Sequence, residues 1–357
     1  MSRFAKIAER LDASGLDAMM ITSWPNRLYA TQFKSSAGMA IVTKTGSYFF
    51  TDSRYIEAAK KNITDADIRL STNDISLTDL ANEVIKAHNI QKLGFEDQYA
   101  TVSEYNGWQK KLTCKELVPA TGLLTELRQV KDEEEVKCLI AAQRIAEKAL
   151  KDVLEFIKPG KTEKEISAYL QYRMLCHGAE KLSFEPIVVS GANSSMPHGV
   201  PTDKPVEDGD FITMDFGCVY GGYCSDMTRT VAVGHATEEM EKVYYTVLEA
   251  QKAGIAAAKG GVTGKLVHEA GAKVISDAGY GAYFGHGFGH SLGVEIHEDP
   301  RFAPSNDKPI PAGAVLSAEP GIYLPGKFGV RIEDVIILQK DGCVDIMEAP
   351  HELIILK

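Results

Sequence analysis

Two aspartates flank a tight turn in residues 210–233, DFITMDFGCVYGGYCSDMTRTVAV, and their spacing suggests metal chemistry. The segment predicts two strands joined at the sequence YGG. With the turn centred between Tyr220 and Gly221, Asp215 lies directly opposite Asp226 on one face of the sheet. Like charges opposed at such short range destabilise a ladder unless something neutralises them, and a divalent cation would do so.

The strand around Asp215 is apolar, with neighbours Phe211, Met214 and Phe216. An ionised carboxylate among such residues needs a strong partner. The alternative is that Asp215 and Asp226 are two solvated aspartates on an outer face of the sheet.

Three of the nine histidines lie close together in residues 285–301, GHGFGHSLGVEIHEDPR: His286, His290 and His297. Imidazole binds transition metals and also donates protons near neutral pH. Although a single histidine is more often structural, the surrounding glycines allow close approach of the backbone to a site. The segment therefore predicts a functional loop.

Two glutamates interrupt apolar strands near the C-terminus. Glu319 lies in residues 314–323 and Glu333 in residues 329–338, and the sequence LPGKFG between them predicts a hairpin. A surface glutamate in each strand is the alternative. With the aspartates and histidines, the glutamates form an oxygen-rich set suited to Mn²⁺-like cations and able to hold two of them.

The first 123 residues predict a mixed α/β domain that would not itself carry this chemistry. Helical spacing predicts a helix over residues 4–12 and another in TDLANEVIKAH, and the short apolar runs DAMMIT, AIVTK and SYFFTD predict strands. We expect domains at residues 1–123 and 124–357.

The second domain is expected to begin with one long helix from about Leu124 to before Pro159. A helix starting near Thr162 follows and precedes strands and glycine-rich turns. Helices over residues 237–259 and 263–278 again precede strands, which predicts a duplicated helix-then-sheet unit.

Composition excludes several classes of protein. Lys and Arg number 39 against 49 Asp and Glu, so the net charge of −10 offers no basic field for nucleic acid. Six scattered cysteines without a CxxC pair favour a reducing compartment, and we expect a cytoplasmic location. Neither a signal peptide nor an apolar run of 18 residues occurs, so no membrane association is expected.

Over almost its whole length the chain resembles the pita-bread metallopeptidases, in particular their proline-specific branch of Xaa-Pro aminopeptidases and Xaa-Pro dipeptidases (prolidases). The motifs that carry the resemblance are MDFG, SDMTRT, HGFGH, EPGIY and RIED. The resemblance implies a C-terminal α+β pita-bread domain with a pseudo-twofold repeat. It also implies an N-terminal α/β domain of the creatinase type, which includes TDSRY at residues 51–55.

The resemblance implies two divalent ions per subunit, with Mn²⁺ expected and Co²⁺ or Zn²⁺ as alternatives. Their ligands would be Asp215, Asp226, His290, Glu319 and Glu333. A hydroxide bridging the two ions would be the nucleophile, and Glu319 would act as general base and proton shuttle. A homodimer is expected by the same analogy.

The remaining site residues are also assigned by the resemblance. His198, in SGANSSMPHG, and His297 would bind the substrate and stabilise the transition state, and His286 would line the site. Tyr323 and Arg331 lie beside metal ligands in the sequence and would orient them.

Phe184, Ile296 and His297 would form the wall of an apolar pocket for the proline ring, although Phe184 also fits a core aromatic residue. Arg301, in HEDPR, could bind the carboxylate of a dipeptide substrate, whereas a surface arginine after Pro300 is the alternative. Whether dipeptides or longer peptides are preferred stays open.

The expected function is hydrolysis of the Xaa-Pro bond at the N-terminus of proline-containing peptides. One alternative is a related pita-bread enzyme of other specificity, such as methionine aminopeptidase or creatinase. Another is a binding module that has lost catalysis, which the intact set of five ligand positions disfavours. A metal analysis with one Xaa-Pro hydrolysis assay would separate these alternatives.

Overall fold

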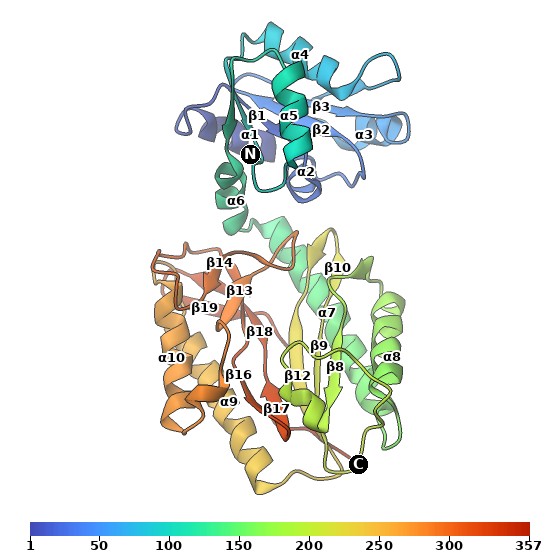
Figure 1. Cartoon of the computed structure of the whole chain (residues 1–357), viewed down its shortest axis with the longest axis vertical. Helices are drawn as coiled ribbons and strands as arrows, with labels where there is room; N and C mark the ends of the chain where they lie inside the picture. Colours follow the sequence, from blue (N-terminus) through green and yellow to red (C-terminus); the bar gives the residue numbers. More distant parts are fainter. The chain divides into compact units, whose positions relative to one another are not determined.

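The computed structural model describes all 357 residues and divides into two compact units, Met1–Arg128 and Gln129–Lys357 (Figure 1). Both units contain helices and strands.

Unit 1 is built on one six-stranded mixed sheet with the strand order β4-β3-β2-β1-β5-β6. Its strands are β1 Ala18–Ile21, β2 Met39–Thr43, β3 Ser47–Thr51, β4 Asp67–Leu70, β5 Lys92–Phe95 and β6 Glu116–Pro119. Its helices are α1 Arg3–Leu11, α2 Trp24–Thr31, α3 Ile56–Asn62, α4 Leu77–Ala87, α5 Val102–Lys111 and α6 Thr121–Gln129. The expected α/β architecture of this region is present.

Alternating side chains of the central strands supply two separate cores in unit 1. Met19 and Ile21 of β1 pack with residues of α1, including Phe4 and Ile7. Ala18 and Met20 pack on the other side with residues of α4 and α5. Because successive strand residues point to opposite faces, both faces of this sheet are covered by helices.

The single long helix expected from Leu124 is wrong, because the chain forms two helices, α6 and α7 (Glu133–Phe156). Asp132 has extended backbone angles and caps α7. Its carboxylate accepts a hydrogen bond from the Glu135 backbone at 3.1 Å, and the Glu135 carboxylate accepts one from the Asp132 backbone at 2.9 Å. This reciprocal capping starts a new helix. The proposed domain boundary between residues 123 and 124 falls inside α6.

Unit 2 contains two halves in which a pair of helices precedes strands. In the first half, α7 and α8 (Glu163–Cys176) precede β7 Lys181–Leu182, β8 Ile187–Ser190, β9 Phe211–Phe216, β10 Cys218–Tyr220, β11 Tyr223–Cys224 and β12 Met227–Val233. In the second, α9 (Glu238–Ala257) and α10 (Gly264–Asp277) precede β13 Gly289–Ser291, β14 Glu298–Phe302, β15 Val315–Ala318, β16 Gly321–Leu324, β17 Phe328–Arg331, β18 Asp334–Gln339 and β19 Gly342–Asp345. The chain ends after β20 Ile355–Leu356, and short 3₁₀ turns occur at Gly191–Ser195 and Gly281–Tyr283.

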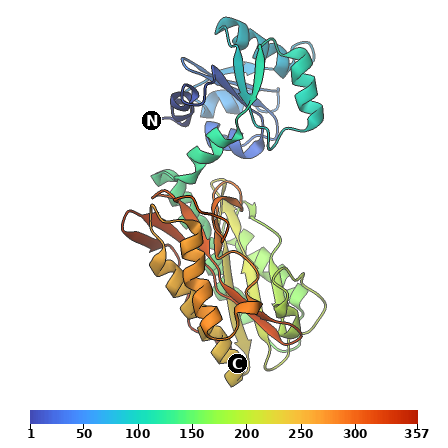
Figure 2. The ribbon, with the colours of Figure 1, turned by 60° about the vertical axis from the view of Figure 1, so that its left-hand side comes forward.

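The strands of unit 2 lie between the two helix pairs, with α7 and α8 on one side and α9 and α10 on the other (Figures 1 and 2). The main sheets have the orders β20-β12-β9-β8 and β14-β13-β15-β18-β19. This arrangement confirms the expected α+β domain with a repeated helix-then-sheet pattern.

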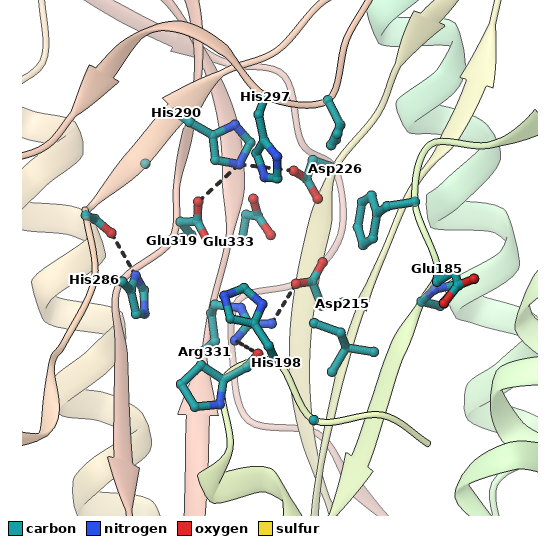
Figure 3. Close-up of a pocket in the computed structure, with 18 of the residues that line it drawn as sticks. Glu185, His198, Asp215, Asp226, His286, His290, His297, Glu319, Arg331 and Glu333 are labelled. Atoms are coloured by element: carbon teal, nitrogen blue, oxygen red, sulfur yellow. Dashed lines mark hydrogen bonds and ion pairs between the residues drawn. The ribbon is translucent and has the colours of Figure 1, made fainter. Parts of the chain in front are cut away.

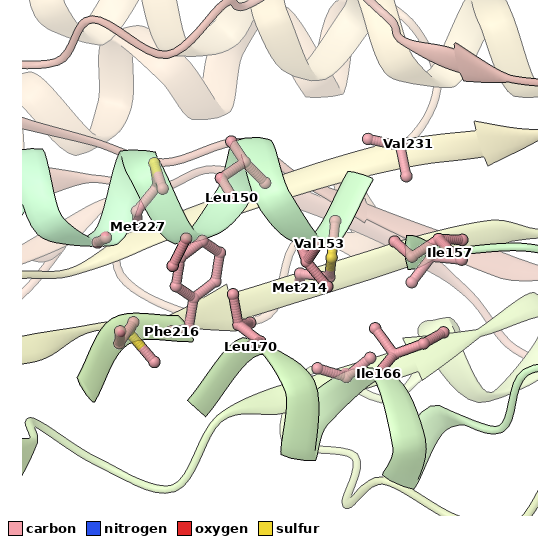
Figure 4. Packing of buried hydrophobic residues seen from close by; sticks show 14 of the residues in the cluster. Leu150, Val153, Ile157, Ile166, Leu170, Met214, Phe216, Met227 and Val231 are labelled. Atoms are coloured by element: carbon pink, nitrogen blue, oxygen red, sulfur yellow. The ribbon is translucent and has the colours of Figure 1, made fainter. Parts of the chain in front are cut away.

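The core beneath α7 and α8 fixes the direction in which Asp215 points (Figure 4). Met214 and Phe216 of β9 are buried there, with Leu150 of α7 and Leu170 of α8. Because strand residues alternate between faces, Asp215 must point to the opposite face of the sheet. Met214 and Phe216, the immediate neighbours of Asp215 in sequence, are therefore core residues and do not surround its carboxylate.

The predicted register of the aspartate hairpin is wrong by two residues. Asp215 pairs with Thr228, and not with Asp226. The turn consists of Gly221 and Gly222, whose φ angles of 60° and 86° suit a two-residue hairpin loop that glycine adopts readily. Since a shift of two residues preserves the alternation of faces, Asp215 and Asp226 still share a face.

The glutamate hairpin is present, but it is divided into two ladders. Ala318 pairs with Asp334 in the β15–β18 ladder, and Gly321 pairs with Arg331 in the β16–β17 ladder. Glu319 and Glu333 lie in the interruption. The Glu319 backbone N–H donates to the Phe288 carbonyl at 2.8 Å, and that of Glu333 donates to the Thr228 carbonyl at 3.1 Å. Where the two ladders are interrupted, the hairpin is therefore hydrogen-bonded to neighbouring segments of the chain.

None of the helices is long and apolar enough to cross a lipid bilayer.

Candidate metal centre

One cavity of about 520 Å³ in unit 2 is lined by every residue that sequence analysis assigned to a site (Figure 3). These residues come from both halves of the unit. In the first half they lie in β9, just before β12 and in the loops on either side of β8, and in the second half they lie within residues 286–333, between α10 and β18. The residues are Phe184, His198, Asp215, Asp226, His286, His290, Ile296, His297, Arg301, Glu319, Tyr323, Arg331 and Glu333.

The centre of the cavity holds three side chains whose ligand atoms all lie within 4.8 Å of one another: Asp226, His290 and Glu333. Asp226 and Glu333 are buried, and the His290 side chain is only 12% exposed. Glu319 adjoins this group, since its Oε1 is 3.3 Å from His290 Nε2. The Asp226 Oδ2 is 3.5 Å from the same nitrogen.

Two carboxylate oxygens in the centre are buried without any hydrogen-bond partner, Asp215 Oδ1 and Glu333 Oε1. The other oxygen of each carboxylate is satisfied. Arg331 donates to Asp215 Oδ2 at 2.6 Å, and the Thr228 hydroxyl donates to Glu333 Oε2 at 2.7 Å. A buried carboxylate oxygen without a partner is costly, and an oxygen-rich group of this kind suits hard divalent cations. The residues therefore fit a metal.

The carboxyl groups also repel one another in a medium that solvates them poorly. Burial raises the pKa of Asp226 well above its ordinary value, and the charges of Asp215 and Glu319 raise it further. Burial likewise raises the pKa of Glu333, with Asp226 as the next cause. A bound cation would offset these costs because it favours the ionised carboxylates.

His290 is oriented as a metal ligand. Its Nδ1 is 3.1 Å from the Ser291 carbonyl, and a carbonyl oxygen can only accept a hydrogen bond. Nδ1 therefore carries the proton, and the lone pair of Nε2 faces Asp226 and Glu319 in the neutral ring. Burial lowers the pKa of His290, which favours that neutral form.

Opposing effects act on the pKa of Glu319. Burial raises its pKa, whereas His286 and Arg331 lower it. The Ser317 hydroxyl donates to Glu319 Oε1 at 3.0 Å and accepts from the His290 backbone at 3.0 Å. Ser317 thus ties the two neighbouring ligand positions together.

Arg331, Tyr323 and His286 form a hydrogen-bonded chain along one side of the cavity. Arg331 Nη1 donates to the Tyr323 hydroxyl at 2.9 Å. His286 Nδ1 donates to the Gly287 carbonyl at 2.8 Å, so its Nε2 accepts from the Tyr323 hydroxyl at 3.0 Å. Both ring nitrogens of His286 are therefore engaged within the protein.

His198 and His297 differ from His286 because both are exposed and neither has a hydrogen-bond partner within the protein. The His297 ring packs edge-on against His290, with centroids 4.5 Å apart. His198 lies below the carboxylates in the view of Figure 3. Both imidazoles are thus available to a molecule in the cavity.

The apolar wall and the candidate cation also lie at the cavity. Phe184 and Ile296 are partly buried there, so Phe184 is not a fully buried core residue. Arg301 pairs with His290 in the β13–β14 ladder. Its side chain is 56% exposed, and its Nε is 3.8 Å from Asp299.

Sequence analysis missed two hydroxyl residues that hold the ligands, Thr228 and Ser317. Each lies two positions from a ligand, Thr228 after Asp226 and Ser317 before Glu319. The period of two in a strand places such residues on the same face. Strand alternation was therefore the signal that could have identified both.

Two family models match the chain. Residues 137–340 match metallopeptidase family M24, and residues 3–130 match the creatinase/prolidase N-terminal domain. The chain belongs to metallopeptidase family M24. It is therefore a hydrolase with the expected pita-bread fold, and the resemblance noted from its motifs is confirmed.

The relatives and solved structures cover nearly the whole chain. An uncharacterized peptidase of Bacillus subtilis is 40% identical over 99% of this chain and 100% of that protein. An Xaa-Pro dipeptidase of Pyrococcus horikoshii is 36% identical over 98% of this chain and 97% of that protein. The structure of an Xaa-Pro dipeptidase from Bacillus anthracis has a TM-score of 0.95 and 40% identity, covering 99% of both chains. That of an X-Pro aminopeptidase from Thermotoga maritima has a TM-score of 0.92 and 35% identity, covering 97% of this chain and 99% of the other.

Proposed function

We propose that this metallopeptidase hydrolyses the Xaa-Pro bond at the N-terminus of peptides, using two divalent ions. The names of its relatives, which include both dipeptidases and an aminopeptidase, support this specificity. The observation that carries the metal-dependent chemistry is the pair of buried, unpartnered oxygens, Asp215 Oδ1 and Glu333 Oε1, in the cavity where the ligand atoms of Asp226, His290 and Glu333 lie close together.

The proposed ligands are the five positions Asp215, Asp226, His290, Glu319 and Glu333. Mn²⁺ is the proposed ion, with Co²⁺ or Zn²⁺ as alternatives, because carboxylates outnumber imidazole in the set. When bound, the two ions would lower the pKa of a shared water, supply hydroxide as the nucleophile and polarise the scissile carbonyl.

The protein's own groups would manage protons and orientation during hydrolysis. Glu319 would accept the proton of the attacking water and deliver it to the proline nitrogen as the C–N bond breaks. His198 and His297, which have no partners within the protein, would donate hydrogen bonds to the carbonyl oxygen as it gains charge. Arg331 would keep Asp215 in place through its 2.6 Å hydrogen bond, and Tyr323 would support Arg331.

The proline ring would contact the apolar part of the cavity, formed by Phe184, Ile296 and the face of His297. His286 would line the same cavity, where its hydrogen bond with Tyr323 holds its ring in place. A wall of this kind favours a compact apolar ring but does not discriminate among the other residues of the peptide. The identity of the Xaa residue is therefore left to other contacts.

The test of this function compares Xaa-Pro with Xaa-Ala dipeptides before and after removal of divalent ions with a chelator. Hydrolysis of Xaa-Pro alone, lost on chelation and restored by Mn²⁺, is expected. Equal hydrolysis of both peptides would indicate a family member of other specificity, and no hydrolysis of either would favour a binding module.

Arg301 is the proposed determinant of substrate length. In a dipeptide the carboxylate follows the proline directly, and a guanidinium at the cavity rim could bind it. Comparison of Xaa-Pro with Xaa-Pro-Yaa in wild type and Arg301→Ala tests the role. The dipeptide should lose far more kcat/KM than the tripeptide, and equal losses would exclude Arg301 from substrate binding.

A homodimer and a cytoplasmic location remain predictions of the resemblance and of the cysteine pattern. Sedimentation analysis of the purified chain measures the first. Fractionation of the source cells measures the second.

A further inference from the structure

The segment of residues 191–202, here called the His198 loop, forms one side of the candidate active site. Its residues 197–201 line the cavity consecutively. Much of the loop is exposed, including Met196 at 48% and Val200 at 75%. An exposed connection of this length is ordinarily mobile, so something must hold His198 if its imidazole is to act on a bound peptide.

Glu163, the first residue of α8, joins the two ends of this loop. Its side chain is fully buried. Oε1 accepts hydrogen bonds from the backbone and hydroxyl of Ser190, at 2.6 and 2.9 Å, and from the Asn193 amide at 3.1 Å. Oε2 accepts from the backbone and hydroxyl of Thr202, at 2.9 and 2.7 Å. One carboxylate therefore fixes the residue before the loop and the last residue in it.

Glu163 is not needed to cap its own helix. Thr162 caps α8, and Glu165 completes the capping box by accepting from the Thr162 backbone at 2.9 Å. The buried carboxylate of Glu163 is thus directed entirely at the His198 loop and its flanks. The groups that face its two oxygens are N–H and O–H donors of Ser190, Asn193 and Thr202.

The opposite side of the loop rests on β17, which ends two residues before the proposed ligand Glu333. The Gly329 backbone donates to the Ser194 hydroxyl at 2.8 Å, and Arg331 Nη1 donates to the Pro197 carbonyl at 3.3 Å. A Cβ at Gly329 would lie 2.2 Å from the Ser194 carbonyl oxygen, so the contact is close. The loop is held between Glu163 and β17.

We propose that Glu163 is a positioning residue that holds the His198 loop so that the His198 imidazole faces the scissile carbonyl. This inference rests on the proposed function of His198. Glu163 touches neither the cavity nor the proposed metal ligands, so its loss should act through the loop alone.

The test is a double-mutant cycle between Glu163→Gln and His198→Ala in the full chain loaded with Mn²⁺. In Glu163→Gln the new NH₂ group meets N–H and O–H donors, which breaks one half of the anchor. We expect kcat/KM for Xaa-Pro to fall about tenfold or more in this variant, with unchanged metal content. In the His198→Ala background, Glu163→Gln should have no further effect, because coupled residues are not additive.

Glu165→Gln is the matched control, since it alters an exposed carboxylate in the same helical turn and glutamine also serves in a capping box. It should leave kcat/KM unchanged. If Glu163→Gln does not fold, Thr202→Val removes one hydroxyl donor and should lower kcat/KM less strongly in the same direction. Hydrogen exchange of residues 190–202 should rise in the Glu163 variant and not in the control.

Wild-type kcat/KM in Glu163→Gln, or losses that multiply in the double variant, would overturn the proposal. Failure of the role proposed for His198 would be seen in the His198→Ala variant alone. If His198→Ala alone retains wild-type turnover, His198 does not act on the substrate, and the positioning role of Glu163 falls with it.

Discussion

At the scale of single residues, the histidines of the cavity differ in whether their ring nitrogens are available to a bound molecule. His290 shares one ring nitrogen with a backbone carbonyl and turns the other toward carboxylates, as a metal ligand does. Both nitrogens of His286 are engaged by protein groups. His198 and His297 alone present free imidazoles to the cavity.

His297→Ala should therefore retain the metal content of the wild type while kcat falls about 10²-fold, the usual loss for a donor that stabilises the transition state. Metal analysis and steady-state kinetics on the same preparation measure both quantities. His235→Ala, which changes an exposed histidine paired with Asp208, should alter neither. Loss of metal in His297→Ala would contradict the assignment.

Motif residues were easier to predict than the residues that support them. The ligand positions could be named because each lies in a short motif, and the structure brings all of them to one cavity. Thr228 lies in the motif of Asp226, and Ser317 lies two residues before Glu319, but a hydroxyl two residues from a ligand has many other uses. Glu163 could not be found, because its partners Ser190 and Thr202 are brought to it only by the fold.

At the scale of elements, most helices and strands followed from apolar periodicity, whereas register and interruptions did not. The aspartate hairpin was misjudged because either of two positions in YGG could centre the turn. The positive φ angles of both glycines decide between them. The break between α6 and α7 was missed since helical periodicity continues on both sides of Asp132.

Close packing of β13 against β15 makes Gly289 a sensitive position. A Cβ there would lie 2.0 Å from the Ser317 carbonyl oxygen. Gly289→Ala should force the strands apart, destabilise the protein by about 1–3 kcal/mol or more and weaken metal binding through the adjacent His290. Chemical denaturation and metal analysis measure these effects.

Gly285→Ala is the matched control, because an added Cβ at Gly285 meets open space within the same glycine-rich segment. Its stability and metal content should equal those of the wild type. Equal stability of both variants would show that β13 and β15 can adjust, contrary to this account.

The contact between α7 and α8 should depend on pH through Asp152. Hydrogen bonds from His177 and Arg173 lower the pKa of Asp152 below its ordinary value. A lowered pKa in the folded state stabilises the fold above the unfolded value, about 3.9, and the contribution is lost as pH falls further. The wild type should thus lose more Tm between pH 5 and pH 3 than Asp152→Asn does.

Glu249→Gln, which removes an exposed pair with Lys252 on α9, should leave the slope of Tm against pH unchanged. The same slope in Asp152→Asn and wild type would exclude a role for Asp152 in acid stability.

At the scale of the whole molecule, the proposed chemistry belongs to one unit. All five proposed ligands lie in residues 129–357, whereas unit 1 has its own buried cores. Ligand binding stabilises only the folded state that binds it. Mn²⁺ should therefore raise the transition temperature of unit 2 in calorimetry of the full chain and leave that of unit 1 unchanged.

An isolated fragment 1–128 provides the reference transition for unit 1, provided that it folds alone, which its circular dichroism will show. A shift of this transition by Mn²⁺ would place a metal site outside the proposed centre.

The measurement that tests the central claim most directly is the number of divalent ions bound per chain after equilibrium dialysis against Mn²⁺, in wild type and Asp226→Asn. The account predicts two ions in the wild type, fewer in Asp226→Asn, and loss of most Xaa-Pro hydrolysis with them. Two ions and normal turnover in Asp226→Asn, or no bound ion in the wild type, would contradict it.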